Sequence, residues 1–460
     1  MKTERMRISG VTIIKPTQLK TEHTWSIETN NTINNMHHFE EKQERITYIK
    51  EKGTLESPRL QIGDKAQGMI ISCLKGSILA VIFDLRKSSP SYLQKETIEL
   101  SDNNNYELYI PKGIAYGYQT LTDSVILSSK YDNDFDKEKE RCINYQDKTL
   151  NMTWPINNII ISDEDKAGLS FEEYQKSTKK ILITGGKKAL PMALKNILEK
   201  LHYQVLTPSL AEFNIIFPES VENYFKNHQP DIVIHTAGYY DVDQAEIEKV
   251  DCNLTNVIGT SNVCKIADKY YCKVIYLSNE HVFDGKKDSP YSPYDEPNPI
   301  NHYGYTKMLA ENIADGTRCP IIIRTSRLFD NYDESFLNNI IYLAKEKDTI
   351  HVVNDQIGSP TYAVDLAKAI SQIVELDKCG YYHITNKNAC SYYEYAKQIC
   401  EIKGFTTKII PISSEEYRKQ YPESALRPQN GCLEDSLHDF EMPTYQDALI
   451  RCLKKDNHSS

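Results

Sequence analysis

The stretch Lys180-Ile181-Leu182-Ile183-Thr184-Gly185 decides the fold of the larger part of this 460-residue chain. It is a short apolar run that ends at a glycine and leads into a segment with helical spacing, as expected for a buried strand followed by a helix. Four more apolar runs of this type come later, each separated from the next by helical spacing: 204–206, 231–236, 274–278 and 321–325. Such alternation predicts an α/β fold with a doubly wound parallel sheet.

The turn after the first of these strands is where a Rossmann-type dinucleotide fingerprint would lie, because glycines there let the backbone approach a pyrophosphate. Gly185 fills the first glycine position, but the second and third positions hold Lys188 and Pro191. We expect the Lys188 side chain to obstruct phosphate, although its charge attracts one, and Pro191 to be tolerated only in the first helical turn. The second strand ends in Thr207-Pro208-Ser209-Leu210, which lacks the acid or arginine that selects NADH or NADPH.

A second informative stretch is Tyr303-Gly304-Tyr305-Thr306-Lys307, which follows the strand-like run 273–278 and a proline-rich loop. Residues four apart share a helix face, so Lys307 is expected to lie over Tyr303 and lower its pKa from about 10. A tyrosine tuned in this way can protonate a carbonyl group. The spacing alone is also consistent with a solvated helix face, since it occurs twice more, at Tyr48/Lys52 and Tyr393/Lys397.

Before about residue 170 the apolar runs are short, extended and separated by turn residues: 68–73, 78–85, 106–110 and 124–128. The runs on either side of Lys75-Gly76-Ser77 predict a β-hairpin. Many short strands with few helical periods predict an all-β, cupin-like jelly roll. We therefore expect a β domain over 1–169, a polar linker over 170–179, and an α/β domain over 180–456 that ends in a small substrate-binding subdomain.

The composition excludes several classes of partner. A net charge of −10 without a basic block argues against nucleic acid and anionic membranes. The eleven cysteines contain no C-x-x-C pair and cannot all pair, which favours reduced thiols. The chain shows neither a signal-peptide core nor an apolar run near the roughly 20 residues of a membrane span, so we expect a cytoplasmic protein. His37 and His38 are adjacent and would lie on opposite sides of a strand, so we expect no metal site.

Four later motifs follow one another in a specific order in the second half: 233–246, 278–285, 354–367 and Arg427-Pro428. Over residues 180 to about 454 the chain resembles dTDP-4-dehydrorhamnose reductase, an extended short-chain dehydrogenase. The resemblance implies catalytic positions at Tyr303, Lys307 and Asn279, the last in place of a threonine. It also implies contacts to NADPH or NADH and to a nucleotide-linked deoxysugar, the former from Gly185, Lys188, Ala237, Gly238 and Tyr239, the latter from Asp355, Gln356, Thr361 and Arg427.

The first half carries a different set of motifs: 10–16, 66–69, 83–92, 110–118 and 153–155. Over residues 6 to 170 it resembles dTDP-4-dehydrorhamnose 3,5-epimerase, a family that uses a histidine supported by an aspartate as its base. Here Arg59 stands at the histidine position and stays protonated near neutral pH, while Asp165 remains. The other changes fall at Glu56 for a phosphate-facing arginine, Met69 for a lysine, Tyr116 for a histidine, and Asp134 or Phe135 for the tyrosine acid.

Two hypotheses from different classes remain open. Erosion of both catalytic sets favours a sugar-nucleotide-binding or regulatory pseudoenzyme that keeps both scaffolds, with an inactive epimerase half. The alternative is an active NAD(P)H-dependent reductase of a nucleotide-linked 4-keto-6-deoxy sugar. The epimerase resemblance also implies a homodimer formed through the β half, and two-fold pairing is the commonest oligomer. Fold resemblance cannot decide between the hypotheses, because function belongs to the site.

Overall fold

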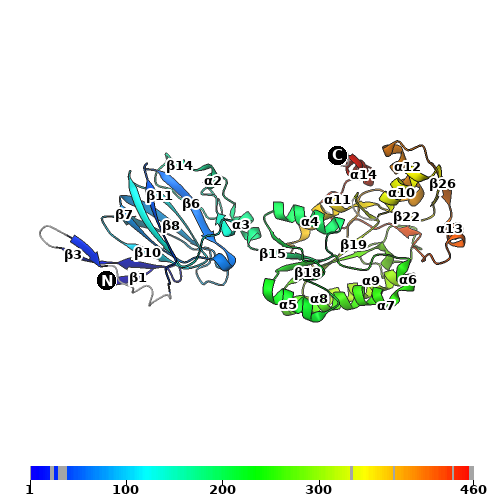
Figure 1. Ribbon diagram of the computed structural model, residues 1–460, viewed down its shortest axis with the longest axis horizontal. Coiled ribbons are helices and arrows are strands. Elements are labelled where there is room, and N and C mark those ends of the chain that lie inside the picture. Colours follow the sequence, from blue (N-terminus) through cyan, green and yellow to red (C-terminus); the bar gives the residue numbers. More distant parts are fainter. Residues whose placement is uncertain are drawn as a thin grey trace. The chain divides into compact units, whose positions relative to one another are not determined.

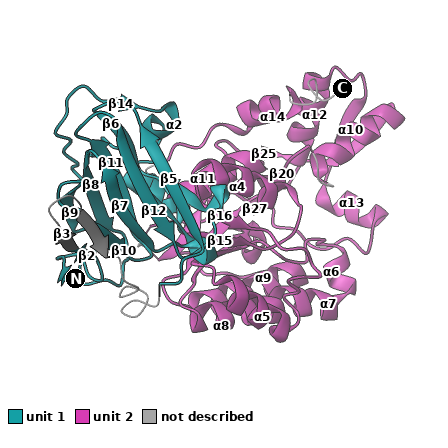
Figure 2. Cartoon of the chain, turned by 60° about the vertical axis from the view of Figure 1, so that its left-hand side comes forward, with its two compact units in different colours: residues 1–178 teal, residues 179–460 magenta. Residues whose placement is uncertain are grey.

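Antiparallel strands build the first of the two compact units into which the chain divides, Met1–Thr178 and Lys179–Ser460 (Figure 2). The structure is a computed structural model that describes residues 2–20, 25–28, 39–331, 335–376, 379–437 and 440–454. His37 and His38, which entered the prediction about metals, lie outside the described residues.

Two six-stranded sheets form the first unit, and Figure 1 shows them face to face. The first sheet has the order β1 (Lys2–Arg5), β2 (Thr12–Lys15), β10 (Glu107–Ile110), β7 (Met69–Lys75), β12 (Val125–Tyr131), β5 (Gln43–Ile49). The second has the order β13 (Glu140–Cys142), β6 (Thr54–Gln61), β11 (Ile114–Thr120), β8 (Ser77–Asp84), β9 (Lys95–Ser101), with β14 (Ile160–Ile161) beside β6. The remaining elements are β3 (Thr17–Lys20), β4 (Trp25–Glu28), η1 (Gly63–Lys65), η2 (Lys137–Lys139), α2 (Asp163–Lys166) and α3 (Phe171–Ser177). The predicted cupin-like β architecture is confirmed.

The predicted hairpin around Gly76 is wrong. β7 and β8 belong to different sheets, and the turn at Gly76, with a φ of +79°, carries the chain from one sheet to the other. Apolar side chains from both sheets, including Ile71 and Ile82, meet in the core between them. A tight turn between two apolar strands looks the same in sequence whether the strands pair side by side or pack face to face.

The segment expected to be a polar linker is instead a helix of the first unit. Ser170 and Glu173 form a capping box at the start of α3, which explains why a charged segment is helical. Phe171 and Tyr174 of this helix are buried in a cluster that includes Phe83 of β8. The helix is amphipathic, and its two apolar side chains are too few to mark it clearly in a charged stretch.

The second unit contains the predicted parallel sheet. Its order is β16 (Gln204–Leu206), β15 (Lys180–Ile183), β17 (Ile232–His235), β18 (Lys273–Asn279), β19 (Ile321–Thr325), β24 (Gly380–His383). Alternate residues of β15 face opposite sides, with Ile181 and Ile183 in one core cluster and Leu182 in another. α4 (Ala189–Lys200) and α11 (Ala363–Ile373) cover one face, and α5 (Pro218–His228), α8 (Thr260–Lys269) and α9 (His302–Asp315) cover the other (Figure 1). The strand order reverses between β15 and β17, which is where open α/β sheets bind their ligands.

The small subdomain expected at the C-terminal end has a core of its own within the second unit. Its helices are α10 (Phe336–Glu346), α12 (Tyr392–Lys403), α13 (Ser414–Gln420) and α14 (Tyr445–Lys454). Its strands are β20 (Leu328–Phe329), β21 (Thr349–Val353), β22 (Ile357–Gly358), β23 (Thr361–Tyr362), β25 (Cys390–Ser391), β26 (Lys408–Ile412) and β27 (Asn430–Gly431). Short elements α6 (Gln244–Ile247), α7 (Lys249–Asn253), η3 (Leu254–Gly259) and η4 (Glu280–Val282) complete the unit.

The cysteines depart in part from the expectation of reduced thiols. Cys319 and Cys379, just before β19 and β24, form a disulfide, while the other nine cysteines are not in a disulfide. The two partners are 60 residues apart in sequence, and β19 and β24 pair directly in the sheet, so the fold brings the cysteines together. Among the described helices, none has the length and apolar character needed to cross a membrane.

Candidate functional site

The turn after β15 keeps the backbone form of a dinucleotide site. Gly185 and Gly186 have φ values of +101° and +70°, in the region that favours glycine. A side chain at Gly185 would meet Thr236 Oγ1 at 2.6 Å, so this position requires glycine for contact as well. Lys188 has φ −73° and ψ 166° as the N-cap of α4, a conformation open to any residue. The missing glycine at position 188 therefore does not distort the turn.

Pro191 is the third residue of α4, which confirms its predicted place in the first helical turn. A proline there removes only an N–H group that would have no partner within the helix. The backbone N–H groups of Ala189 and Leu190 remain at the helix start, where the helix dipole favours an anion.

A buried hydrogen-bond network joins the ends of β15 and β17. Thr184 Oγ1 accepts hydrogen bonds from the backbone N–H groups of Thr236 (3.1 Å) and Ala237 (2.9 Å). The ring of His235 lies between two hydroxyls, with Nδ1 2.8 Å from Thr184 Oγ1 and Nε2 3.1 Å from Thr260 Oγ1. Burial lowers the pKa of His235 to about 3, so the ring is neutral. Sequence reasoning missed His235, because nothing in a strand of apolar residues marks a histidine as a support for the turn.

The residues predicted to contact a cofactor after β17 lie beside this network. A Cβ added at Gly238 would lie 3.1 Å from Asn256 Oδ1, so the chain passes close to η3 at this point. Asn256 Oδ1 accepts a hydrogen bond from the backbone N–H of Tyr239, at 2.7 Å. The Tyr239 hydroxyl donates to the Glu248 carboxylate at 2.6 Å, so the Tyr239 side chain is held at the start of α7.

Tyr303 and Asn279 are brought together as predicted. Tyr303 is 3% exposed on the first turn of α9, and the Asn279 amide Nδ2 donates a hydrogen bond to its hydroxyl oxygen. Asn279 Oδ1 accepts from the backbone N–H of His281 at 3.1 Å, which fixes the amide with its nitrogen toward the tyrosine. The Tyr303 hydroxyl hydrogen therefore remains free to point toward a substrate.

The expected effect of Lys307 on Tyr303 is not found. Burial raises the pKa of Tyr303 well above 10, and the nearby Tyr240 phenol adds to that shift. The Lys307 Nζ donates to the Leu277 carbonyl at 2.7 Å and lies 4.3 Å from the centre of the Tyr276 ring. Burial lowers the pKa of Lys307 itself to about 7. A carbonyl of β18 has drawn the lysine away, which helix spacing alone cannot reveal.

Unsatisfied hydroxyl groups occur on β18 and β19, the strand of Asn279 and its neighbour. The side-chain oxygens of Tyr276, Ser278 and Thr325 are buried and have no hydrogen-bond partner among the described residues. Asn279 of β18 and Thr325 of β19 are paired in register, so Ser278 and Thr325 lie at the carboxyl ends of adjacent strands, with Tyr276 further back on β18. A buried hydroxyl without a partner is costly, and such groups near the ends of two adjacent strands are suited to a polar ligand.

A cavity of about 1200 Å³ lies in the second unit and is lined by Asp355, Gln356 and Arg427, as predicted. Asp355 accepts from the backbone N–H of Ser414 at 2.9 Å, and Gln356 Nε2 donates to the Ser414 hydroxyl at 2.9 Å. Arg427 makes two hydrogen bonds of 2.9 Å with the Asp243 carboxylate. The lining that sequence reasoning missed includes Lys286, Lys347, Arg418, Tyr392, Tyr417 and Tyr421.

Thr361 is a correction to the predicted substrate contacts. It is fully buried in β23, and its hydroxyl donates to the Ser359 carbonyl at 3.1 Å. It is not part of the cavity lining. The motif around it places Asp355 and Gln356 at the cavity wall, whereas Thr361 comes after the chain has turned back into the protein.

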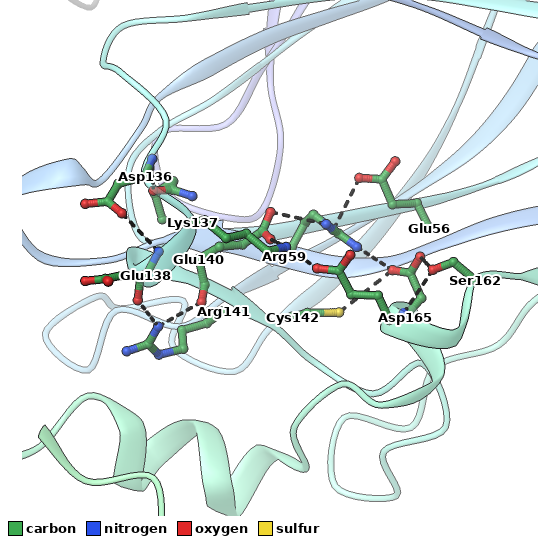
Figure 3. A network of polar contacts seen from close by, with 12 residues as sticks. Glu56, Arg59, Asp136, Lys137, Glu138, Glu140, Arg141, Cys142, Ser162 and Asp165 are labelled. Carbon is green, nitrogen blue, oxygen red and sulfur yellow. Dashed lines mark hydrogen bonds and ion pairs between the residues drawn. The ribbon is translucent and has the colours of Figure 1, made fainter. Parts of the chain in front are cut away.

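The first unit holds a charged network where the epimerase resemblance places a base (Figure 3). Arg59 contacts Asp165 at 2.6 Å, Glu140 at 3.2 Å and Glu56 at 3.3 Å. Burial opposes the charge on Arg59, but the three carboxylates outweigh it and raise its pKa further above the ordinary value. Asp165 also accepts from the Ser162 hydroxyl at 2.6 Å. A guanidinium held in this way cannot remove a proton from carbon.

Comparison with known proteins identifies relatives of both halves. The family model described as RmlD substrate binding domain matches residues 179–458, and that of dTDP-4-dehydrorhamnose 3,5-epimerase matches residues 5–173. Spore coat polysaccharide biosynthesis protein SpsK of Bacillus subtilis is 35% identical over 247 residues, 54% of this chain and 87% of that protein. The dTDP-4-dehydrorhamnose reductase of Aggregatibacter actinomycetemcomitans is 33% identical over 267 residues, 55% of this chain and 90% of that protein.

A solved structure also aligns with the second unit. It is that of dTDP-4-dehydrorhamnose reductase from Bacillus anthracis in complex with NADP, with a TM-score of 0.58 and 31% identity. The alignment covers 60% of this chain and 99% of that chain.

Proposed function

Because the chain belongs to the RmlD substrate-binding-domain family, fused to a domain of the dTDP-4-dehydrorhamnose 3,5-epimerase family, we propose that its second unit is an active NAD(P)H-dependent reductase. Its substrate would be a nucleotide-linked 4-keto-6-deoxy sugar of the dTDP-rhamnose type. The observation that carries this proposal is the Asn279–Tyr303 contact, beside buried hydroxyls that lack partners. This favours the alternative from the sequence over the pseudoenzyme.

The residues around the turn after β15 fit a dinucleotide. The left-handed glycines, the N–H groups at the start of α4, and Ala237 and Gly238 would hold its phosphates and nicotinamide ribose. When bound, a reduced nicotinamide supplies the hydride. The second strand offers no charged residue to choose between NADPH and NADH, so the choice stays open.

Tyr303 is the acid in this proposal. Asn279 donates to its oxygen, so the phenolic hydrogen is directed away from the amide and toward a substrate carbonyl oxygen. Burial keeps the phenol protonated at all ordinary pH values, so the acid form is always ready. As the proton leaves, the amide hydrogen bond stabilises the developing phenolate.

Lys307 supplies positive charge rather than direct contact. Its pKa near 7 means that it is partly protonated in a neutral solution. The ammonium lies over the Tyr276 ring and donates to the Leu277 carbonyl of the strand that carries Asn279, so it adds positive charge next to the site without bonding to Tyr303.

The cavity lined by Asp355, Gln356 and Arg427 has the chemistry for the rest of the substrate. Lys286, Lys347 and Arg418 offer charges for a diphosphate, and tyrosines 392, 417 and 421 offer ring faces for a nucleobase. Arg427 is already neutralised by Asp243, so we assign it a shaping role in the wall.

We further propose that the first unit does not epimerise. Arg59 stays charged among three carboxylates, so the base of the epimerase family has no equivalent at that position. If so, the purified chain incubated with a 4-keto-6-deoxy sugar nucleotide in D₂O should place no deuterium at C3 or C5. Incorporation above the level of a no-protein control would contradict this.

The reductase proposal is tested with purified full-length chain. NADPH and NADH are titrated while nicotinamide fluorescence and thermal stability are followed, since a ligand of the folded state raises the melting temperature. The sample is then given dTDP-4-dehydro-L-rhamnose, and absorbance at 340 nm reports oxidation of the coenzyme. Coenzyme binding with turnover supports the reductase. Binding of the sugar nucleotide alone, without coenzyme binding or turnover, would instead support the binding protein.

A further inference from the structure

Lys188 and Tyr240 make a contact that neither motif predicts. Lys188 stands in the turn after β15 and Tyr240 in the loop after β17, and the Lys188 Nζ lies 4.1 Å from the centre of the Tyr240 ring. The Tyr240 hydroxyl donates to the Thr236 carbonyl oxygen, which folds the ring back over its own loop. Its Cζ atom lies 3.6 Å from the position a side chain at Gly238 would take.

This contact spans the switch point of the sheet. β15 and β17 are neighbours, and a dinucleotide in such a fold lies across their carboxyl ends. Tyr240 joins the phosphate-side turn to the catalytic side, because its phenol lies near enough to Tyr303 and Tyr276 to affect both electrostatically. Tyr240 is 39% exposed, so one side of the ring faces solvent.

We propose that Lys188 and Tyr240 form a latch that closes the dinucleotide site in the free protein and opens when the coenzyme enters. On opening, the Lys188 ammonium exchanges the Tyr240 ring for the pyrophosphate. This inference deepens the proposed reductase function and rests on it. It gives a physical role to the lysine that stands where a glycine is expected: the position needs no special φ, and its charge serves first the ring and then the phosphate.

The strength of the contact sets the expected effect. A cation over an aromatic ring at an exposed site and a neutral hydrogen bond are each weak, so we expect these contacts to favour the closed form over the open form by about three- to thirty-fold. The apparent affinity for the coenzyme equals the affinity of the open form multiplied by the fraction of protein that is open. Removing the ring should therefore strengthen coenzyme binding by about the same factor of three to thirty.

The test compares dissociation constants for NADPH in full-length wild type, Tyr240→Ala, Tyr240→Phe and Lys188→Met, each at low and high salt. We expect Tyr240→Ala to bind more tightly than wild type, and Tyr240→Phe, which keeps the ring, to fall between them. Lys188→Met should bind more weakly and lose much of the salt dependence. The matched controls are Lys187→Met, one residue earlier in the turn, and Tyr305→Ala, another exposed tyrosine; both should bind as wild type does.

A second measurement examines the latch without coenzyme. Lysines are ¹³C-methylated, and the Lys188 signal, assigned by its loss in Lys188→Met, should be displaced by the Tyr240 ring current in free wild type and normal in Tyr240→Ala. A displaced signal with no NADPH binding by any variant would reject the reductase function and the coenzyme-gated role with it, leaving only the contact. Equal affinities for wild type and Tyr240→Ala, with an undisplaced signal, would overturn the latch while leaving the reductase intact.

Discussion

The hydrogen bond between Asn279 and Tyr303 is the residue-scale feature on which the proposed chemistry depends. An amide donor at this position leaves the phenol free to give its proton to a substrate, whereas an amide turned the other way would compete for that proton. The backbone N–H of His281 decides the orientation by binding the amide oxygen. The exchange of threonine for asparagine therefore preserves a donor at the site.

Tyr303→Phe should lower the turnover of dTDP-4-dehydro-L-rhamnose by about 10²- to 10⁴-fold, because it removes the general acid. Its dissociation constant for NADPH should stay close to that of wild type, since the ring remains. Tyr305→Phe, two residues along the same helix and 47% exposed, is the control and should keep full activity. Equal turnover of Tyr303→Phe and wild type in a steady-state assay would reject Tyr303 as the acid.

Lys307 makes a testable contribution to pH dependence. Its pKa is about 7 in the folded chain and near 10.5 when exposed, so between these values only the unfolded chain holds the proton. Stability must then rise with pH across that window, by at most about 1.4 kcal/mol per pH unit, and stay level with respect to this group below pH 7.

In Lys307→Met that rise should disappear. Urea unfolding of wild type and Lys307→Met between pH 6.5 and 9.5 measures the difference, and Lys187→Met serves as the exposed control. A constant difference in the free energy of unfolding across this range would show that Lys307 is not deprotonated by burial.

The sequence predicts most of the residues at the site, but it does not predict which groups their side chains contact. Tyr303 and Asn279 meet as expected because both follow motifs whose spacing fixes a helix and a strand end. Lys307 binds a carbonyl 30 residues away, and Thr361 turns into the protein; both depend on the packed surroundings. Tyr240 belongs to a recognised motif, but only the fold places it against Lys188.

At the scale of elements, α9 is positioned by a close approach to the chain after β18. A Cβ at Gly304 would lie 2.0 Å from the His281 carbonyl oxygen, so no other residue lets the helix sit so near. Asn301 caps the helix, its Oδ1 accepting from the Gly304 N–H at 2.7 Å. The distance between Tyr303 and Asn279 is set by this approach.

Gly304→Ala should therefore destabilise the second unit by about 2–4 kcal/mol and reduce activity, because the helix must move. Gly316→Ala is the matched control: it ends the same helix, has an ordinary φ of −73°, and its nearest neighbour would be 3.4 Å away. Thermal melts of both variants give the answer. Similar melting temperatures for the two variants would show that α9 can move away from His281 without loss of stability.

Element types followed from periodicity, and the exceptions have physical causes. All five predicted strands of the second unit form the parallel sheet, because buried strands are continuous apolar runs between helices. The hairpin at Gly76 failed because turn residues do not record which sheet the next strand joins. The expected linker is the helix α3, because the charged residues of this segment outnumber its two buried aromatic residues.

At the scale of the whole molecule, each unit has its own hydrophobic core, which predicts two unfolding transitions. Arg59→Met should lower the free energy of unfolding of the first unit alone, by about 3–5 kcal/mol, because it leaves carboxylates buried without a cation. Lys137→Met is the control, because it pairs with the same Glu140 from a side chain that is 63% exposed.

The Arg59→Met deficit should shrink as pH falls, because the orphaned carboxylates take up protons. Differential scanning calorimetry with NADPH identifies the second unit, whose transition alone should rise with the coenzyme. A single transition that shifts in the same way in all variants would mean that the two units unfold together.

Dimerisation through the β half stays a prediction.

Three histidines of the second unit, two of them fully buried and one partly buried, give acid a selective action on this chain. Burial lowers the pKa values of His235, His281 and His383 to about 3, whereas unfolded histidines titrate near 6.5. Each pH unit below 6.5 then removes up to about 4 kcal/mol of stability from three such groups, against a typical total of 5–15 kcal/mol. The described part of the first unit contains no histidine. Acid below pH 6.5 should thus destabilise the second unit through groups that the described part of the first unit lacks, so a mildly acidic buffer offers a means of studying the first unit while the second is unfolded.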